Sequence, residues 1–446
     1  MKKSKTIKVF SLILALALGL SLFSVGCGEK DEVSGKDSTA NANGEETSLS
    51  LDEVMDSMPS SLKGTTINYF IWYDPMETVE ADVIKDFEAK TGCKVNIQIG
   101  SYVNYITELN AKVSTGDAPD VVRMLNNGIS RVKSLQPLDT ANFNFNDTAW
   151  DKATMKDYTY NGKSYATNLV NTAFYDGLVV LYNKDNLEQN GIDDPYELWK
   201  NGQWTWSTFE KLATQYKKLG EDYIGASFCP IDAYAMSKGT GYVTYNGTEY
   251  VNNMSDPTLT AAWKQTLNWV KSGVVSKNIW EMDKFMAGKC GFFFASISGA
   301  RTKDTGYRKF KAKKQLAVAP MPSSDDGSKD YQPLIEYSAW GIPQGAKNPE
   351  AVPYFLRFML DMKNYSGDLF ISDAAEEIYK EMISNPNRQA DAAGDTITDD
   401  SGINAGAISY EVLQSDPEQI STILQNYAGV VSDAVSKANE QISRLQ

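Results

Sequence analysis

The residue types in this chain exclude several kinds of catalytic chemistry. There is no histidine among the 446 residues, which removes the Ser-His-Asp and Cys-His nucleophile systems and the HExxH metal helix. Lys and Arg number 43 against 57 Asp and Glu, and the formal net charge is −14. No excess of basic surface is therefore available to neutralise phosphates. We expect neither a histidine-dependent hydrolase nor a partner made of nucleic acid.

The clearest group of side chains suited to binding follows the first predicted strand, Ile67–Trp72. Trp72, Tyr73 and Asp74 place two aromatic rings and a carboxylate at its carboxyl end, where ligands lie in open α/β sheets. Packing of Trp72 against the strand end is the alternative. Asn126 follows the third predicted strand, where turn formation explains an asparagine about as well.

The hydrophobic pattern predicts the elements that position these residues. Apolar residues alternate or cluster as in strands and then recur at helical spacing, and this β-α-β-α-β order is typical of an α/β domain with a parallel sheet. A second passage of strands and helices begins at Gly177 and predicts a second α/β lobe. The predicted strands of the first passage are Ile67–Trp72, Val95–Ile99 and Asp120–Met124, with helices at Val79–Phe87 and Val103–Val113.

The N-terminus carries the pattern of an export signal. Four lysines precede an uncharged, largely apolar stretch, Val9–Gly26, for which a retained membrane anchor is the alternative. Ser24-Val25-Gly26-Cys27 resembles the lipobox of bacterial lipoproteins. We expect residues 1–26 to be removed and Cys27 to carry lipid, so that the protein is anchored to the cell membrane on its extracytoplasmic face.

Residues 27–62 follow as a flexible tether, rich in small and charged residues. The spacing of Leu51, Val54, Met55 and Met58 permits a short helix, which we assign to the tether. The remaining cysteines match no metal motif and are predicted to be small buried residues. They are Cys93, Cys229 and Cys290.

Five short motifs occur in the order found in one known family. Together they resemble the bacterial extracellular solute-binding proteins, family 1, which are the substrate receptors of ABC importers for sugars and include the maltose-binding protein. The motifs are Phe87–Ile99, Thr115–Val122, Gly162–Ala166 with Leu181–Lys184, Trp206–Phe209 and Phe285–Lys289.

The resemblance implies a periplasmic-binding-protein-like fold, with two α/β lobes, a hinge and a ligand cleft between the lobes. Carried onto this sequence, the N-terminal lobe comprises residues 63–170 and 318–360. The C-terminal lobe comprises residues 171–317 and 361–446. In such proteins the lobes close on the solute.

The resemblance also implies a carbohydrate ligand, whose apolar faces stack on aromatic rings and whose hydroxyl groups bind polar side chains. For Arg301, an ion pair at the surface is an equally good interpretation. Trp340 is a stacking candidate on the strand that also carries Glu336 and Tyr337. Besides Trp72, Tyr73, Asp74 and Asn126, the expected ligand-binding residues are Asn171, Tyr175, Asp232, Tyr234, Ser298, Arg301, Glu336, Tyr337 and Trp340.

The sequence thus predicts a monomeric, lipid-anchored receptor that delivers a sugar or oligosaccharide to the permease subunits of an ABC transporter. It predicts no catalysis, no cofactor and no metal. One alternative is a surface glycoside hydrolase or lyase, which needs two facing carboxylates. The other is a binding protein for a peptide or another polar solute, because the same fold serves many ligands.

Overall fold

The computed structural model describes residues 46–445, apart from 79, 103, 126–128, 171–174, 228–230, 279–280, 302–310, 312, 314, 326–334, 362–369 and 386–404. Cys229, Asn126 and Asn171 lie outside the described residues, as does the predicted signal segment. Among the described residues, no helix is both long and apolar enough to cross a bilayer.

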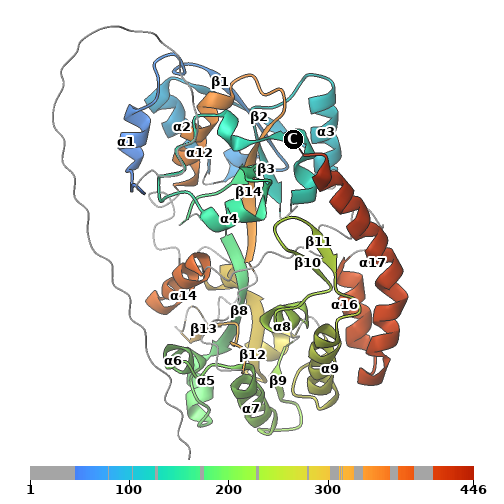
Figure 1. Cartoon of the computed structure of the whole chain (residues 1–446). Coiled ribbons are helices and arrows are strands. Elements are labelled where there is room, and N and C mark those ends of the chain that lie inside the picture. Colours follow the sequence, from blue (N-terminus) through green and yellow to red (C-terminus); the bar gives the residue numbers. More distant parts are fainter. Residues whose placement is uncertain are drawn as a thin grey trace, which may run out of the picture. The chain divides into compact units, whose positions relative to one another are not determined.

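The first sheet confirms the predicted β-α-β-α-β order (Figure 1). Its parallel strands run in the order β2-β1-β3, and β14 adds antiparallel to β3. Two short strands, β4 and β7, pair with β14. The bounds are β1 (Thr66–Ile71), β2 (Lys94–Ile99), β3 (Val121–Leu125), β4 (Leu135–Gln136), β7 (Ala166–Thr167) and β14 (Ile335–Pro343).

Helices cover this sheet because their apolar faces need burial. Val83, Ile84 and Phe87 of α2 are buried, and Phe87 meets Phe355 of α12 edge-on with ring centres 5.4 Å apart. The neighbouring elements are η1 (Pro75–Glu77), α2 (Glu80–Thr91), α3 (Tyr105–Ser114), η2 (Ile129–Ser134), η3 (Leu138–Thr140), α4 (Lys152–Asp157), β5 (Thr159–Tyr160), β6 (Lys163–Ser164), η5 (Pro349–Ala351) and α12 (Val352–Leu360).

The second sheet is built on the long strand β8 (Tyr175–Asn183), which pairs antiparallel with both β12 (Cys290–Ser296) and β13 (Leu316–Pro320). β9 (Ile224–Ala226) adds parallel to β12. β14 pairs with the start of β8, which joins the two sheets. Because β13 runs along β8, residues 318–320 belong to the second sheet, whereas the sequence analysis assigned them to the N-terminal lobe.

The helices around the second sheet pack on a core rich in buried tryptophan and phenylalanine side chains. Trp206 is the first residue of α7 (Trp206–Lys217) and is buried, and the N-cap is Thr205, whose hydroxyl accepts from the Thr208 amide at 3.3 Å. The other elements are α5 (Lys184–Gln189), α6 (Pro195–Lys200), α8 (Ile231–Ser237), β10 (Val243–Tyr245), β11 (Tyr250–Asn252), α9 (Pro257–Lys271), α10 (Met282–Met286), η4 (Ile297–Ala300), α14 (Asp373–Ser384), α16 (Ala405–Gln414), η6 (Pro417–Gln419) and α17 (Ile420–Ser443).

Two glycines let α7 approach the second sheet closely. A Cβ on Gly225 of β9 would lie 2.3 Å from the Ala213 carbonyl oxygen and 2.6 Å from the Val274 carbonyl oxygen. A Cβ on Gly291 of β12 would lie 2.6 Å from Cγ of Tyr216. Any side chain at these positions would therefore have to displace backbone or a buried ring.

Part of the segment assigned to the tether is folded onto the first sheet. Helix α1 (Leu51–Asp56) begins with a capping box between Ser50 and Glu53, and it lies against α12. Met55 and Met58 are buried in the same apolar core as Phe87. The assignment of residues 47–62 to a flexible tether is therefore wrong, because their methionines find a partner about 300 residues further along the chain.

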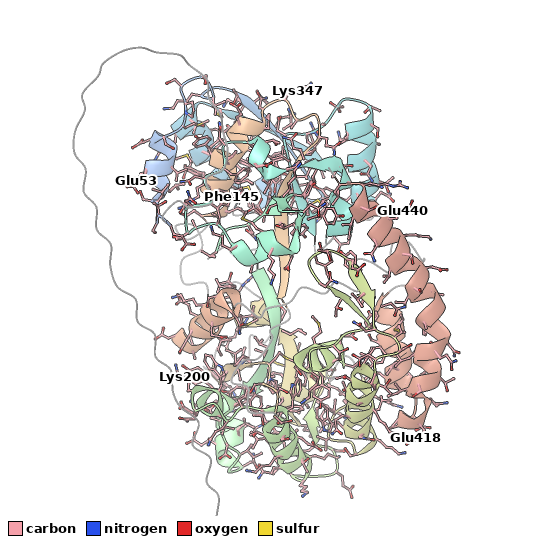
Figure 2. The ribbon with its side chains drawn as sticks, in the orientation of Figure 1. Glu53, Phe145, Lys200, Lys347, Glu418 and Glu440 are labelled. Carbon is pink, nitrogen blue, oxygen red and sulfur yellow. The ribbon has the colours of Figure 1, made fainter. Side chains whose placement is uncertain are left out.

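A buried ion pair holds the start of this segment. Arg357 of α12 donates from Nε to Asp147 at 3.2 Å, from Nη1 to Asp361 at 3.1 Å and from Nη2 to the Leu49 carbonyl at 2.8 Å. Thr47 forms an isolated parallel β-bridge with Asp147, and the Thr47 amide donates to the Asn146 carbonyl at 2.8 Å. In contrast to this buried pair, Glu53 and Glu440 lie on the surface (Figure 2).

A protein that begins at Asp52 should therefore be less stable than one that begins at Glu46. The truncation removes the Ser50 cap and the Leu49 carbonyl, and so leaves a buried Arg357 N–H without its acceptor. We expect a loss of about 1–3 kcal/mol in the free energy of unfolding. Urea denaturation of the two proteins, followed by circular dichroism, measures the difference; equal midpoints would contradict the docking of this segment.

Candidate functional site

Aromatic residues gather where the strands of the first sheet end at their carboxyl side. We call Trp72, Tyr73, Tyr102, Tyr105 and Arg123 the strand-end cluster. The Trp72 ring is partly buried and meets Tyr73, Tyr102 and Tyr105 edge-on, with ring centres 5.7, 6.3 and 5.2 Å apart. The structure thus places the first predicted site residues at the edge of the sheet where ligands bind in α/β folds.

Three members of the cluster, Tyr102, Tyr105 and Arg123, were not among the predicted site residues, and Tyr102 is the exposed one. It follows β2 after Gly100 and Ser101, and its side chain is 66% exposed. A single exposed aromatic side chain is ordinary, but Tyr102 lies beside the partly exposed Trp72, and the two form an aromatic patch. The sequence contained a signal for Tyr102. The rule that ligands bind at the ends of strands selects Trp72 after the first predicted strand, and it applies equally to the residues that follow the second predicted strand, Val95–Ile99.

Tyr73 and Asp74 have local partners. The Tyr73 hydroxyl accepts from Nη1 of Arg123 at 2.5 Å and donates to Oε1 of Glu80. Asp74 caps η1, with its carboxylate accepting from the Met76 amide at 2.9 Å. The Asp74 carboxylate is only partly buried, and it has further acceptor positions beyond this one bond.

Glu80 is a buried carboxyl group next to this cluster, in the first turn of α2. Burial raises the pKa of Glu80 above its usual range, while the Tyr73 hydrogen bond and the charge of Arg123 act in the opposite direction. Burial also raises the pKa of Tyr73, so this phenol stays protonated at neutral pH. The hydroxyl can therefore serve both neighbours, accepting from Arg123 and donating to Glu80.

Trp340 does not reach the surface in this structure. Its side chain is 0% exposed, and its indole N–H lies 3.4 Å from the hydroxyl of Tyr69. This part of β14 is buried on both faces, because Ser338, Ala339 and Ile342 are buried as well. The stacking role predicted for Trp340 is at odds with this position in the core of the first sheet.

The backbone brings three other predicted residues together where the sheets join. Tyr337 of β14 is the register partner of Tyr175 of β8, and Glu336 is the partner of Asp176. The two predicted tyrosines, far apart in sequence, are therefore neighbours in the strand pairing. Asn126 and Asn171 lie outside the described residues.

The predicted residues of the second sheet divide into two groups. Tyr234 of α8 is buried in the aromatic core, edge-on to Trp206 at 4.8 Å, and Asp232 accepts from the Ser409 hydroxyl at 2.6 Å. Ser298 of η4 and Arg301 are partly exposed. The Ser298 hydroxyl lies 2.6 Å from that of Ser296, and the backbone of Arg301 forms an isolated antiparallel β-bridge with Phe370.

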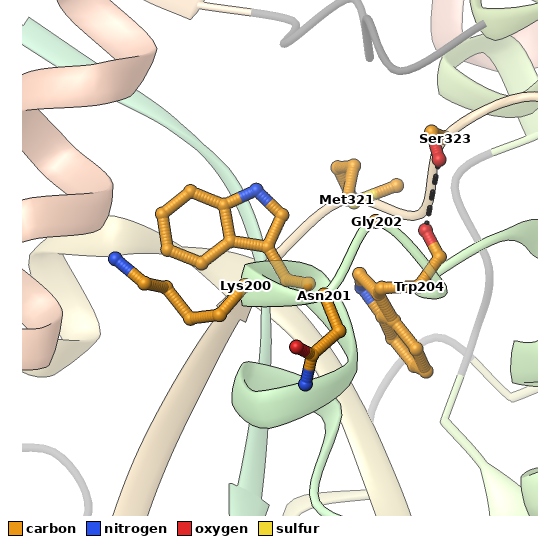
Figure 3. A pocket seen from close by; sticks show the side chains of 7 residues that line it. Lys200, Asn201, Gly202, Trp204, Met321 and Ser323 are labelled. Atoms are coloured by element: carbon orange, nitrogen blue, oxygen red, sulfur yellow. Dashed lines mark hydrogen bonds between the residues drawn. The ribbon is translucent and has the colours of Figure 1, made fainter.

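Two surface hollows lie apart from the predicted residues. One, of about 240 Å³, lies at the end of α6 and is lined by Trp199, Lys200, Asn201, Gly202, Trp204, Met321 and Ser323 (Figure 3). In it, the Ser323 hydroxyl donates to the Trp204 carbonyl at 3.0 Å. The other, of about 480 Å³, is lined by Lys133 of η2, by β4, by Tyr165 and Gln344, and by the end of α17 with Arg444.

The cysteines and acidic residues of the described part give no sign of a metal site. No group of three or more Cys, Asp or Glu side chains in that part is arranged to hold a metal ion. Cys93 and Cys290 are buried free thiols, as predicted. Burial raises the pKa of the Cys290 thiol, which keeps it in the unreactive protonated form.

The fold and the sequence together define a class of protein. Residues 82–366 match the sequence pattern of the bacterial extracellular solute-binding proteins. The chain belongs to this family, whose members bind solutes and are not enzymes. The α/β architecture with two mixed sheets agrees with that assignment.

Particular relatives can then be named. The chain is 25% identical over 373 residues to the diacetylchitobiose binding protein DasA of Streptomyces coelicolor, covering 77% of this chain and 80% of that protein. It is 24% identical over 364 residues to a maltooligosaccharide ABC transporter solute-binding lipoprotein of Streptococcus pneumoniae, covering 78% and 75%. Among solved structures, an extracellular solute-binding protein from Staphylococcus aureus in complex with maltose shares the fold, with a TM-score of 0.63 and 14% identity over 83% of this chain and 98% of that one.

Proposed function

We propose that this protein is the carbohydrate receptor of an ABC importer. It holds a sugar or oligosaccharide between an N-terminal lobe built on the first sheet and a C-terminal lobe built on the second. The observation that carries this proposal is the strand-end cluster, in which Trp72 and the exposed Tyr102 offer aromatic surface beside the carboxylate of Asp74. Aromatic planes with adjacent hydrogen-bonding groups are what a saccharide requires.

Two relatives bear names that state carbohydrate binding, and this supports the same ligand class here. Cys27 is the proposed lipid attachment site, and the permease subunits in the membrane are the proposed partners of a monomeric receptor. A lobe-bridging ligand favours closure only by the difference between its affinities for the closed and open conformations. Tyr175 and Tyr337, paired where the sheets join, are the candidates for contact near the hinge.

A panel of sugars tests this proposal. The lipid-free protein beginning at Glu46 should show a saturable rise in melting temperature with at least one mono- or oligosaccharide, since a ligand that binds only the native state stabilises it by mass action. Diacetylchitobiose and maltooligosaccharides are the first sugars to include. Chromatography of each mixture should recover the sugar unchanged; consumption of the sugar would instead support a glycoside hydrolase or lyase.

Trp72→Ala should weaken binding of whichever sugar is found by about 30-fold or more, equivalent to roughly 2 kcal/mol, because a central aromatic contact is lost. Isothermal titration calorimetry measures the affinity. Trp199→Ala is the matched control: Trp199 is also a partly exposed tryptophan, but it lines the hollow beside α6. Loss of binding in the Trp199 variant alone would move the site away from the strand-end cluster.

A further inference from the structure

Arg123 lies in the middle of β3 and is surrounded by aromatic rings. Its guanidinium carbon lies 4.9 Å from the centre of the Trp72 ring, 5.4 Å from that of Tyr73 and 5.3 Å from that of Trp340. A guanidinium within about 6 Å of a ring centre is attracted to the ring face, most strongly when it is shielded from water. Arg123 therefore contacts both the partly exposed indole of Trp72 and the fully buried indole of Trp340.

A hydrogen bond to Tyr73 also holds Arg123, and Glu80 holds Tyr73 in turn. Nη1 donates to the Tyr73 hydroxyl at 2.5 Å, and that hydroxyl in turn donates to Glu80, whose side chain is 4% exposed. The chain of contacts runs from the buried carboxyl group of Glu80 in α2, through Tyr73, to the Arg123 guanidinium in β3. Burying a carboxyl group is costly unless it is hydrogen-bonded, and Tyr73 supplies that hydrogen bond to Glu80.

We propose that Arg123 is a positioning residue, which holds the indole of Trp72 in the orientation that the solute contacts, with Tyr73 and Glu80 holding Arg123 in place. This inference rests on the proposed function, because Trp72 must contact the solute. A platform fixed before binding costs less ordering entropy when the ligand arrives. The planar guanidinium stacks on rings and bonds at a fixed angle, which a lysine ammonium does not reproduce.

The test compares Arg123→Lys with wild type in two measurements. Acrylamide quenching of Trp72, obtained by subtracting the signal of matched Trp72→Phe proteins, reports the freedom of the indole without any ligand. Calorimetry with the sugar found in the panel reports affinity. We expect Arg123→Lys to increase the quenching of Trp72 and to weaken binding about tenfold, as expected for the loss of a shielded cation–π contact. Tyr73→Phe should move both readouts in the same direction.

Lys112→Met is the matched control, since Lys112 lies over the Phe70 ring at 5.5 Å in the same part of the fold but outside the cluster. It should change neither readout. Unchanged quenching of Trp72 in both Arg123→Lys and Tyr73→Phe would overturn the proposal. Weakened binding without a change in quenching would also overturn it, because Arg123 would then be a direct ligand contact. If Arg123→Lys does not fold, Tyr73→Phe decides. If wild type binds no sugar, the carbohydrate proposal fails, whereas the quenching comparison still decides whether Arg123 positions Trp72.

Discussion

Replacing Arg357 with methionine should lower the free energy of unfolding by about 3–5 kcal/mol, because removal of one partner leaves the other charge buried. Arg357 is 5% exposed and Asp147 is 2% exposed. The substitution leaves the Asp147 carboxylate without its cation and also removes the donor to Leu49. Urea denaturation followed by tryptophan fluorescence measures the loss.

Two further variants separate the ion pair from other effects of the substitution. Arg444→Met removes an arginine that pairs with Glu440 on the exposed face of α17, with both side chains largely in water, and should change stability by less than about 1 kcal/mol. Asp147→Asn added to Arg357→Met should recover part of the loss, because it removes the buried charge and keeps an oxygen for the Ala149 amide. A loss of under 1 kcal/mol for Arg357→Met would contradict this account.

Gly225→Ala should be the most disruptive small substitution in the second sheet, with a loss of about 3 kcal/mol or more. The added methyl would lie within 2.6 Å of carbonyl oxygens on two sides, Ala213 in α7 and Val274 after α9. Because both obstacles are backbone, no side-chain rotation can relieve the clash. Either α7 or β9 must move, and the packing of the neighbouring aromatic rings moves with it.

Thermal denaturation of Gly225→Ala should show this as a fall of several degrees in the melting temperature. Gly429→Ala is the control, because a methyl group at that position in α17 meets open space and alanine favours a helix over glycine by about 1 kcal/mol. Gly291→Ala should resemble Gly225→Ala, since its methyl would meet the Tyr216 ring. A Gly225→Ala protein that melts like wild type would show that α7 lies less tightly on the sheet than described.

The first sheet was predictable because its signals are local. The apolar face of Val83, Ile84 and Phe87 and the strand pattern of Ile67–Trp72 each lie within a few turns or residues, and the order of types then restricts the topology. The helix at Leu51–Asp56 was visible by the same means. Its docking was not, since the surface that buries Met55 belongs to α12, which no local pattern connects to it.

The candidate site was predictable only in part, for a related reason. Strand ends indicate where ligands bind in α/β folds, which selects Trp72 as a candidate, and the same rule selects Tyr102. Alternation along the strand that carries Trp340 allows only one set of its residues to face a cleft, but it cannot show that residues 338–342 are buried on both faces, which places the stacking candidate Trp340 in the core. The contacts of Arg123 with Trp72 and Trp340 join β3 to the end of β1 and to β14, and the sequence alone does not show that these segments meet.

The docking of residues 47–58 has a consequence for how far the receptor can travel. Thr47 is held to the body beside Asp147, and it lies twenty positions after Cys27. A chain of that length spans at most about 70 Å. With lipid on Cys27, Thr47 therefore stays within about 70 Å of the anchor. The effective concentration of the receptor body at a permease beside the anchor is then on the order of millimolar. Under the proposed function, the search of the receptor body for a permease is therefore confined to this small volume.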